Sequence, residues 1–248
     1  MNKPLVIALA AITSLSLAQT QTFKTGLEVI QAIEARPKPK TSISTITLEI
    51  SKNGQTLNRT LKTWSSGDKS LVKFLAPADV KGSGILTIKK NGMTETQLYL
   101  PALNRTRRLA TGGADSSDCD GAFFGSDFSY CDLGNLEINN ADYSLTSSDV
   151  GKYLIEAKPK KSSSYDKLNY EIDAKTLNVL KTDYFKGNKI FKTLKALELG
   201  TVKSYNFIKT TSMETPSQGS KSTFRQISLE LDVAINDNVF TERFLKQP

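Results

Sequence analysis

Residues 45–63, TITLEISKNGQTLNRTLKT, decide the fold class, because apolar and polar residues alternate on both sides of an Asn-Gly pair. An alternation with a period of two is typical of a β-strand that buries one face. The Asn53-Gly54 pair predicts a two-residue turn, since such a turn needs a positive φ at both positions. The stretch is therefore predicted to be a β-hairpin.

The register of this hairpin places Lys52 opposite Gln55 and sorts the side chains onto two faces. One face carries the apolar residues Ile46, Leu48, Ile50, Leu57 and Leu61. Arg59 falls on the same face, opposite Leu48. Because an unpaired guanidinium is costly on an apolar face, we expect Arg59 to hydrogen-bond to carbonyls or an acid on a covering helix or loop.

Alternating segments continue along the rest of the chain. A second hairpin is predicted around Asn91-Gly92. Further strands are expected at residues 152–159, 167–173, 178–185, 189–197, 204–213 and 224–235. In the last of these the alternating apolar residues are Ile227, Leu229, Leu231, Val233 and Ile235. The fold class is mainly β, with one large curved antiparallel sheet whose concave apolar face must be covered by something other than water.

Only two short helical segments are expected. In residues 25–35, Thr25 is a candidate N-cap and Glu28 completes a capping box. The apolar stripe of this helix contains Phe23, Leu27, Val29, Ile30 and Ile33. Pro37 and Pro39 end it. The second segment, residues 236–245, is expected to be helical or irregular.

The amino terminus has the plan of a secretory signal peptide. A lysine at position 3 precedes the apolar run 5–12, and small residues end at Ala18. We therefore expect residues 1–18 to be removed and residues 19–248 to form one domain that is exported and soluble. The net charge of +8 is attributed to solvent-facing lysines, and no nucleic-acid partner is expected in that compartment.

Histidine is absent from the sequence. This removes the Ser-His and Cys-His nucleophiles and the usual nitrogen ligand of zinc. No acidic pair lies in a context that would bury it. We therefore expect neither an enzyme nor a cofactor.

Residues 116–133, SSDCDGAFFGSDFSYCDL, contain the only two cysteines, Cys119 and Cys131. Their short separation in an exported chain favours one disulfide, which would contribute about 3 kcal/mol. The alternative, two free thiols with a redox role, lacks the Cys-x-x-Cys spacing. Part of the segment follows the spacing of a calcium loop, but a serine stands at the first ligand position and an aspartate at the twelfth. No metal site is expected.

The middle of the same segment is aromatic, with Phe123, Phe124, Phe128 and Tyr130. These side chains would either cover the opening of a cavity as a movable lid or pack into a fixed core. Upstream stand Arg105, Arg107 and Arg108. They would bind phosphate or carboxylate at a cavity mouth, or pair with Asp127 or Asp132 of the loop; the pairing with the nearby acids is preferred.

Four stretches carry a resemblance to a known family. They are LVKFLAPADVKGSGIL (71–86), YLPALNRTRRL (99–109), FFGSDFSYCDL (123–133) and AKPKKSSSYDKLNYEID (157–173). In order and spacing they resemble the outer-membrane lipoprotein-sorting proteins, the LolA-like family, over about residues 25–245. The resemblance implies an incomplete (half) β-barrel with a few covering helices, as in LolA and LolB. It also implies an apolar cavity for acyl chains and carriage without chemistry.

The function expected from these observations is that of a periplasmic carrier. It would bind lipid acyl chains or lipoproteins over Ile46, Leu48, Ile50, Leu57 and Leu61, and it would work with an inner-membrane exporter and an outer-membrane acceptor. The alternative is an envelope interaction or regulatory protein on the same fold, which senses lipid or protein without transport. A hydrolase that uses aspartates is a third hypothesis.

Overall fold

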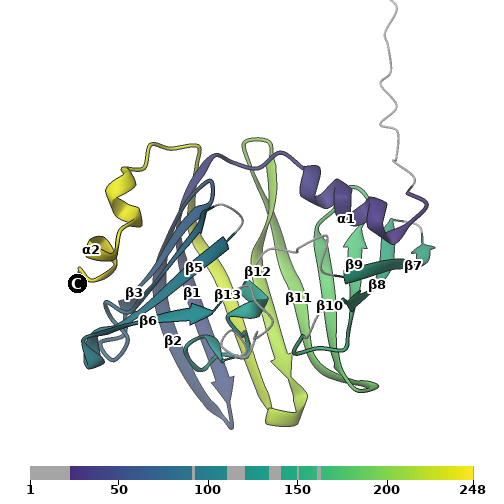
Figure 1. The fold of residues 1–248 in the computed structure, drawn as a ribbon. Helices are drawn as coiled ribbons and strands as arrows, with labels where there is room; N and C mark the ends of the chain where they lie inside the picture. The colour runs from purple at the N-terminus through teal and green to yellow at the C-terminus, as the bar shows by residue number, and fades with distance from the viewer. Residues whose placement is uncertain are drawn as a thin grey trace, which may run out of the picture.

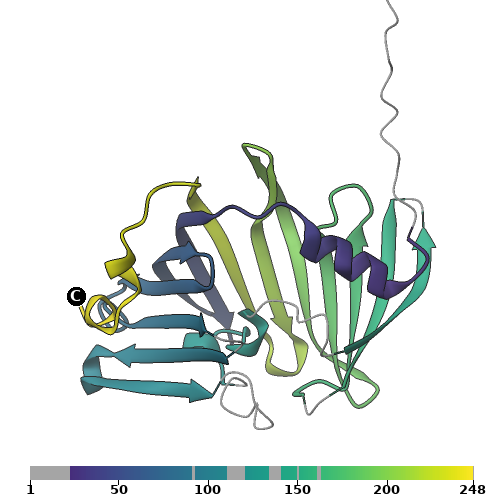
Figure 2. The ribbon, with the colours of Figure 1, turned by 45° about the horizontal axis from the view of Figure 1, so that its top comes forward.

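The chain folds into one curved antiparallel sheet that is not closed into a barrel (Figures 1 and 2). The structure is a computed structural model, and it describes residues 23–90, 93–110, 121–133, 141–149, 151–160 and 163–247. The 13 strands lie in the order β6-β5-β4-β3-β2-β1-β13-β12-β11-β10-β9-β8-β7. The predicted fold class, a half barrel with few helices, is confirmed. The signal segment 1–18 lies outside the described residues.

The elements follow one another in a simple order. The first six strands are β1 (Thr41–Lys52), β2 (Gln55–Ser66), β3 (Lys69–Ala76), β4 (Gly84–Lys90), β5 (Met93–Leu100) and β6 (Arg105–Ala110). The other seven are β7 (Ala141–Asp149), β8 (Lys152–Pro159), β9 (Lys167–Asp173), β10 (Val179–Lys186), β11 (Lys189–Val202), β12 (Tyr205–Thr215) and β13 (Ser220–Leu231). The α-helices are α1 (Gly26–Ala35) and α2 (Glu242–Leu245). Short 3-10 turns are η1 (Pro101–Leu103), η3 (Phe123–Gly125), η4 (Cys131–Leu133), η6 (Pro216–Gln218) and η7 (Asp237–Phe240).

The topology makes the chain cross the molecule once. Strands β1 to β6 run outward to one edge of the sheet, whereas β7 to β13 begin at the opposite edge and run back until β13 pairs with β1. The connection between β6 and β7 must therefore pass from edge to edge. Its described part, residues 121–133, lies in the curve of the sheet (Figure 2).

The first hairpin has the predicted register. Lys52 pairs with Gln55 and Leu48 with Arg59, and both turn residues have a positive φ, 51° at Asn53 and 76° at Gly54. The turn 91–92 of the second predicted hairpin lies outside the described residues. The flanking strands β4 and β5 pair as expected, with Lys90 opposite Met93.

The last strand differs from the prediction. It ends at Leu231, so Val233 and Ile235 lie beyond it. The chain turns at Asp232, where φ is 56° and the carboxylate accepts a hydrogen bond from the Lys40 backbone N–H at 2.8 Å. An alternating sequence alone cannot reveal such a turn, because it depends on a contact with a segment 192 residues away.

Helix α1 begins as predicted. The Thr25 side chain accepts from the Glu28 N–H at 3.2 Å, and the Glu28 carboxylate accepts from the Thr25 N–H at 3.2 Å. The helix buries Val29, Ile30 and Ile33. The expected stripe was too wide, because Leu27 lies on the exposed side of the helix.

Three apolar clusters hold the layers together. On the concave face, residues 121–133 cover the strands around β1, and α1 covers β7 to β9; Leu168 contacts both clusters. On the convex face, η7 and α2 cover Leu71 and Leu86. These two residues alternate with Val72 and Ile85, which point to the concave side, as the pleat of a strand requires. In the described part of the chain, no helix has the length and apolar character needed to cross a bilayer.

Candidate functional site

A short loop fills the centre of the concave face. In residues 121–133, the Phe123 N–H donates to the Phe128 carbonyl at 2.7 Å, and the Tyr130 N–H donates to the Gly121 carbonyl at 3.2 Å. Phe123 and Phe128 are buried against the sheet, with the Phe128 ring 4.6 Å from that of Phe224 on β13. We call residues 121–133 the plug, because they occupy the hollow that the curved sheet would otherwise leave.

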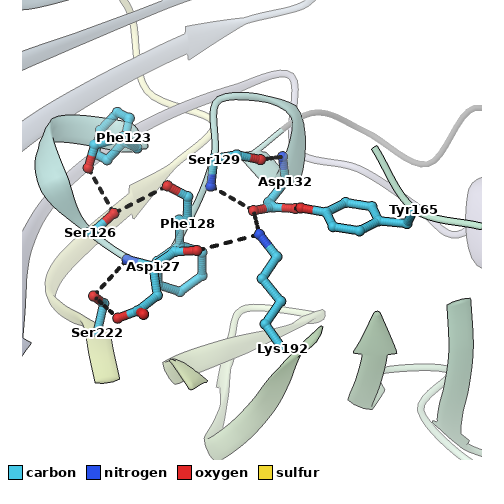
Figure 3. A network of polar contacts seen from close by, with 9 residues as sticks. All are labelled: Phe123, Ser126, Asp127, Phe128, Ser129, Asp132, Tyr165, Lys192 and Ser222. Carbon is cyan, nitrogen blue, oxygen red and sulfur yellow. Dashed lines mark hydrogen bonds and ion pairs between the residues drawn. The ribbon is translucent and has the colours of Figure 1, made fainter. Parts of the chain in front are cut away.

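A buried ion pair fixes one end of the plug to the sheet (Figure 3). The Lys192 ammonium on β11 pairs with the Asp132 carboxylate, and the two side chains are only 3% and 1% exposed. Asp132 also accepts from the Tyr165 hydroxyl at 3.2 Å and from the Ser129 N–H at 2.6 Å. Every oxygen of this carboxylate is thus bonded, which compensates for its removal from water.

A second acid fixes the middle of the plug. The Asp127 carboxylate accepts from the hydroxyls of Ser220 and Ser222 on β13, the latter at 2.6 Å. The Asp127 carbonyl accepts from Lys192 at 3.3 Å, so one ammonium contacts both anchoring segments (Figure 3). These bonds attach the plug to β11 and β13 simultaneously.

Two aromatic rings also lie next to the Lys192 ammonium. It lies 5.1 Å from the ring centre of Tyr165 and 5.2 Å from that of Tyr184, within the range of a cation–π contact. Burial raises the pKa of Tyr184 well above its ordinary value, and the negative Asp132 raises it further. The phenol therefore stays neutral. The contacts around Lys192 hold the plug against β11.

The preferred pairing of the upstream arginines with the plug was wrong. Asp132 is paired with Lys192, and Asp127 with two serines. Arg108 instead lies 3.4 Å from Glu95 on the neighbouring strand, in solvent. The two acids of the plug face β11 and β13, whereas the plug residue near Arg107 is Tyr130, because burial raises the pKa of Tyr130 and the positive charge of Arg107 opposes that rise.

Arg59 contacts the plug. Its Nη1 donates to the Phe124 carbonyl at 2.5 Å, and its guanidinium carbon is 6.0 Å from the centre of the Phe124 ring. Phe124 has a φ of 48°, a left-handed conformation that bulky residues avoid, and the bond from Arg59 holds its carbonyl in that orientation.

The residues predicted to line a cavity differ in their burial. Leu48, Ile50 and Leu61 are buried in the same cluster as Phe123 and Phe128, and Ile46 packs against that cluster. Leu57 is 56% exposed. The plug therefore occupies the space over Leu48, Ile50 and Leu61, and whether it lifts to admit a ligand stays a prediction.

A groove lies on the concave side where helix α1 ends. Its volume is about 520 Å³, and it is bounded by the segment after α1 and by strands β1, β12 and β13. The apolar side chains that line it include Ile33, Leu177, Phe207, Leu229 and Leu231. A volume of this size falls within the range of small-molecule sites.

Local geometry keeps the groove open. After residue 35 the chain runs extended through Pro37 and Pro39, which cannot continue the helix across the groove. On the opposite wall the Phe207 ring lies over Gly200, where an added Cβ would come within 2.6 Å of the ring. No pattern in the sequence indicated this groove. Leu229 and Leu231 were expected only as strand residues, and the facing helix end could not be placed.

Two expectations are not tested. Cys119 lies outside the described residues, so its bridge with Cys131 stays a prediction. The same holds for the loop that follows calcium-site spacing, since its candidate ligands Ser116, Asp118 and Asp120 lie outside the described residues. In the described ranges, no group of three acidic or cysteine side chains is placed to hold a metal.

Comparison with known proteins identifies the family. A family model described as an uncharacterized protein matches residues 66–247. No curated protein matches the chain. A DUF1329 family protein from Desulfovibrio piger is 26% identical, with a TM-score of 0.80 over 89% of this chain and 97% of that one.

Two further solved structures carry the name of the family that the sequence motifs resemble. A putative outer-membrane lipoprotein-sorting protein domain from Vibrio parahaemolyticus is 26% identical, with a TM-score of 0.79 over 90% of this chain and 98% of that one. A LolA superfamily protein from Nitrosomonas europaea shares the fold at 15% identity, with a TM-score of 0.69 over 90% and 100%. The chain belongs to the family whose model matches residues 66–247, and the resemblance predicted from the motifs is confirmed, because the chain is similar in sequence and fold to outer-membrane lipoprotein-sorting proteins.

Proposed function

We propose that the protein is a periplasmic carrier that binds the acyl chains of lipids or lipoproteins on the concave face of its sheet and moves them between membranes. The observation that carries this proposal is the apolar groove of about 520 Å³ at the end of α1. The lipoprotein-sorting relative gives the class of cargo. An inner-membrane exporter would load the carrier, and an outer-membrane acceptor would unload it.

The energetics favour binding on this face. Each buried methylene contributes about 0.8 kcal/mol, so about ten of them contribute roughly 8 kcal/mol against the cost of ordering the chain. An acyl chain seated in the groove would lie along Leu229 and Leu231. The plug borders the same strands, β1 and β13. If the plug lifts, the bound acyl chain can extend over Ile46, Leu48, Ile50, Leu57 and Leu61.

Lipid extraction and mass analysis of protein purified from the periplasm test the proposal. Acyl lipid is expected in stoichiometric amount, and purified protein should transfer a labelled lipid from donor to acceptor vesicles. Leu229→Glu is expected to abolish both, because it places a charge in the groove. Ile227→Glu is the matched control, since Ile227 is 58% exposed on the same strand and does not line the groove. Circular dichroism checks the fold of both variants.

Two results would contradict carriage. A wild-type protein that holds no lipid and binds no lipid probe would show that the concave face is closed. A protein that binds lipid or an envelope protein stably but never transfers lipid would instead support the regulatory alternative.

A further inference from the structure

The groove at the end of α1 differs from an ordinary apolar site in its charges. Three cationic residues line it, Arg36, Lys38 and Lys175, and none of the described residues that line it is acidic. The cations come from two separate places, the end of α1 and the turn after β9. The groove thus has a basic rim and a mainly apolar floor, in which Ser42 and Gln226 are the polar side chains of β1 and β13.

Arg36 lies beside the groove with uncharged partners. Its Nη1 donates to the Thr176 carbonyl and to the Asn178 side-chain oxygen, both at 3.0 Å, and its Nε donates to the Ile33 carbonyl at 3.3 Å. These bonds use the Nε and Nη1 donors of the guanidinium and leave the two N–H groups of Nη2. Burial lowers the pKa of Arg36, and the acidic Glu34 opposes that shift. A half-buried guanidinium without a carboxylate partner would gain from a bound anion.

The acids near the groove are engaged elsewhere. Glu34 pairs with Lys38 at 2.8 Å, so the charge of this one rim cation is already compensated. Asp173 accepts three hydrogen bonds from the backbone and side chain of residues 175–176. Asp232 accepts from the Tyr205 hydroxyl at 3.1 Å and lies 3.9 Å from Lys203. Lys175 has no ion pair within 4.0 Å among the described residues.

We infer that this groove binds a long-chain fatty acid, with the acyl chain on Phe207, Leu229 and Leu231 and the carboxylate between Arg36 and Lys175. The inference rests on the proposed carrier function and narrows its ligand to a single-chain anionic lipid. The volume supports one chain: if a methylene takes about the 30 Å³ of a water molecule, 520 Å³ holds one chain of roughly 16 carbons. A carboxylate matches the fork of a guanidinium, which an uncharged alcohol does not.

Displacement of the uncharged probe Nile red from the mature protein tests the inference. Palmitate, hexadecanol and hexadecyltrimethylammonium have the same chain and differ only in head group. Palmitate is expected to displace the probe at about a tenfold lower concentration than hexadecanol, because it gains charge-assisted hydrogen bonds. The cationic amphiphile is expected to be weaker than the alcohol.

Variants of the basic rim locate the effect. In Lys175→Gln the preference for palmitate over hexadecanol should fall at least twofold, and in Arg36→Gln/Lys175→Gln it should vanish while hexadecanol binding is unchanged. Lys189→Gln, which changes an exposed lysine at the start of β11, should keep the full preference. Lys175→Gln alone remains informative if loss of Arg36 unfolds the protein.

The outcomes separate the inference from the proposed function. Equal displacement by palmitate and hexadecanol, or an unchanged preference in Lys175→Gln, would overturn the inference and leave acyl-chain carriage intact. Extraction of phosphatidylglycerol from vesicles in preference to palmitate would overturn the single-chain ligand. A protein that binds neither Nile red nor any of the three amphiphiles would overturn the proposed function itself.

Discussion

The two halves of the concave face differ in what covers the sheet: the plug fills one half, and the other half is left as a groove. Near the end of β1 and the start of β13, the plug fills the curve of the sheet with Phe123 and Phe128. A buried ion pair fixes it there. At the other end of the same strands, the chain after α1 runs past the sheet through two prolines and leaves a groove of about 520 Å³. A curved sheet therefore stays hollow only where no segment of chain is anchored across it.

Polar side chains of the plug explain why it stays in its half of the concave face. The plug has few backbone bonds to the sheet, and its contacts depend on Asp127 and Asp132, which reach β13 and β11. The groove has no comparable pair of buried charges among the residues that line it. The difference predicts that changes in the plug alter stability, whereas changes in the groove alter ligand binding.

The largest effect on the free energy of unfolding is expected from breaking the buried ion pair. Asp132→Asn leaves the Lys192 ammonium buried without its counter-charge and should lower the free energy of unfolding by about 3 to 5 kcal/mol. Urea denaturation followed by circular dichroism measures it. Lys209→Met, which breaks an exposed pair with Glu198, is the control and should leave the midpoint unchanged. A normal midpoint for Asp132→Asn would show that the plug is not held by this pair.

Truncation of one leucine in each half tests the comparison directly. Leu48 is fully buried under the plug, so Leu48→Ala should cost about 3 kcal/mol of stability. Leu229 lies on an open groove, and Leu229→Ala should cost about 1 kcal/mol or less while weakening Nile red binding. Equal losses of stability would mean that both halves are packed and that the comparison fails.

A smaller effect is expected at the side of the plug that Arg59 contacts. Arg59→Gln removes a charged donor from the Phe124 carbonyl and should cost about 1.5 kcal/mol. Because that bond holds the left-handed Phe124, limited proteolysis within residues 121–133 should become faster. Arg59→Lys keeps the charge but not the guanidinium, so it should give an intermediate rate. Cleavage at the wild-type rate in both variants would remove the anchoring role.

The fold could be predicted from the sequence because the patterns that indicate it are local. The Asn-Gly turn fixed the register of β1 and β2, and the capping box placed the start of α1. The contact between Arg59 and the plug also followed from that register, since a guanidinium on an apolar face needs acceptors. Each of these inferences used residues within about fifteen positions of one another.

The candidate site was only partly predictable, because it depends on pairs far apart in the chain. Lys192 lies in an alternating strand and reads as a solvent-facing lysine, yet it is buried against Asp132, 60 residues away. Asp127 was assigned to nearby arginines, although its partners Ser220 and Ser222 are more than 90 residues distant. The groove needs the end of α1 to face β13, which no local pattern encodes.

The smallest expected effect on stability, and the sharpest on the groove, comes from Gly200. A Cβ at this position would lie 2.6 Å from the Cζ of Phe207, so the ring must shift toward the groove that it lines. Gly200→Ala should therefore weaken palmitate and Nile red binding by about fivefold to tenfold, the range that a crowding cost near 1 kcal/mol produces. Gly121→Ala, in the plug, is the control, because its Cβ would meet Tyr130 at an ordinary 3.8 Å. In a Phe207→Ala background, which lacks the ring, Gly200→Ala should cause no further loss of affinity; an added loss would show that the Cβ does not act through Phe207.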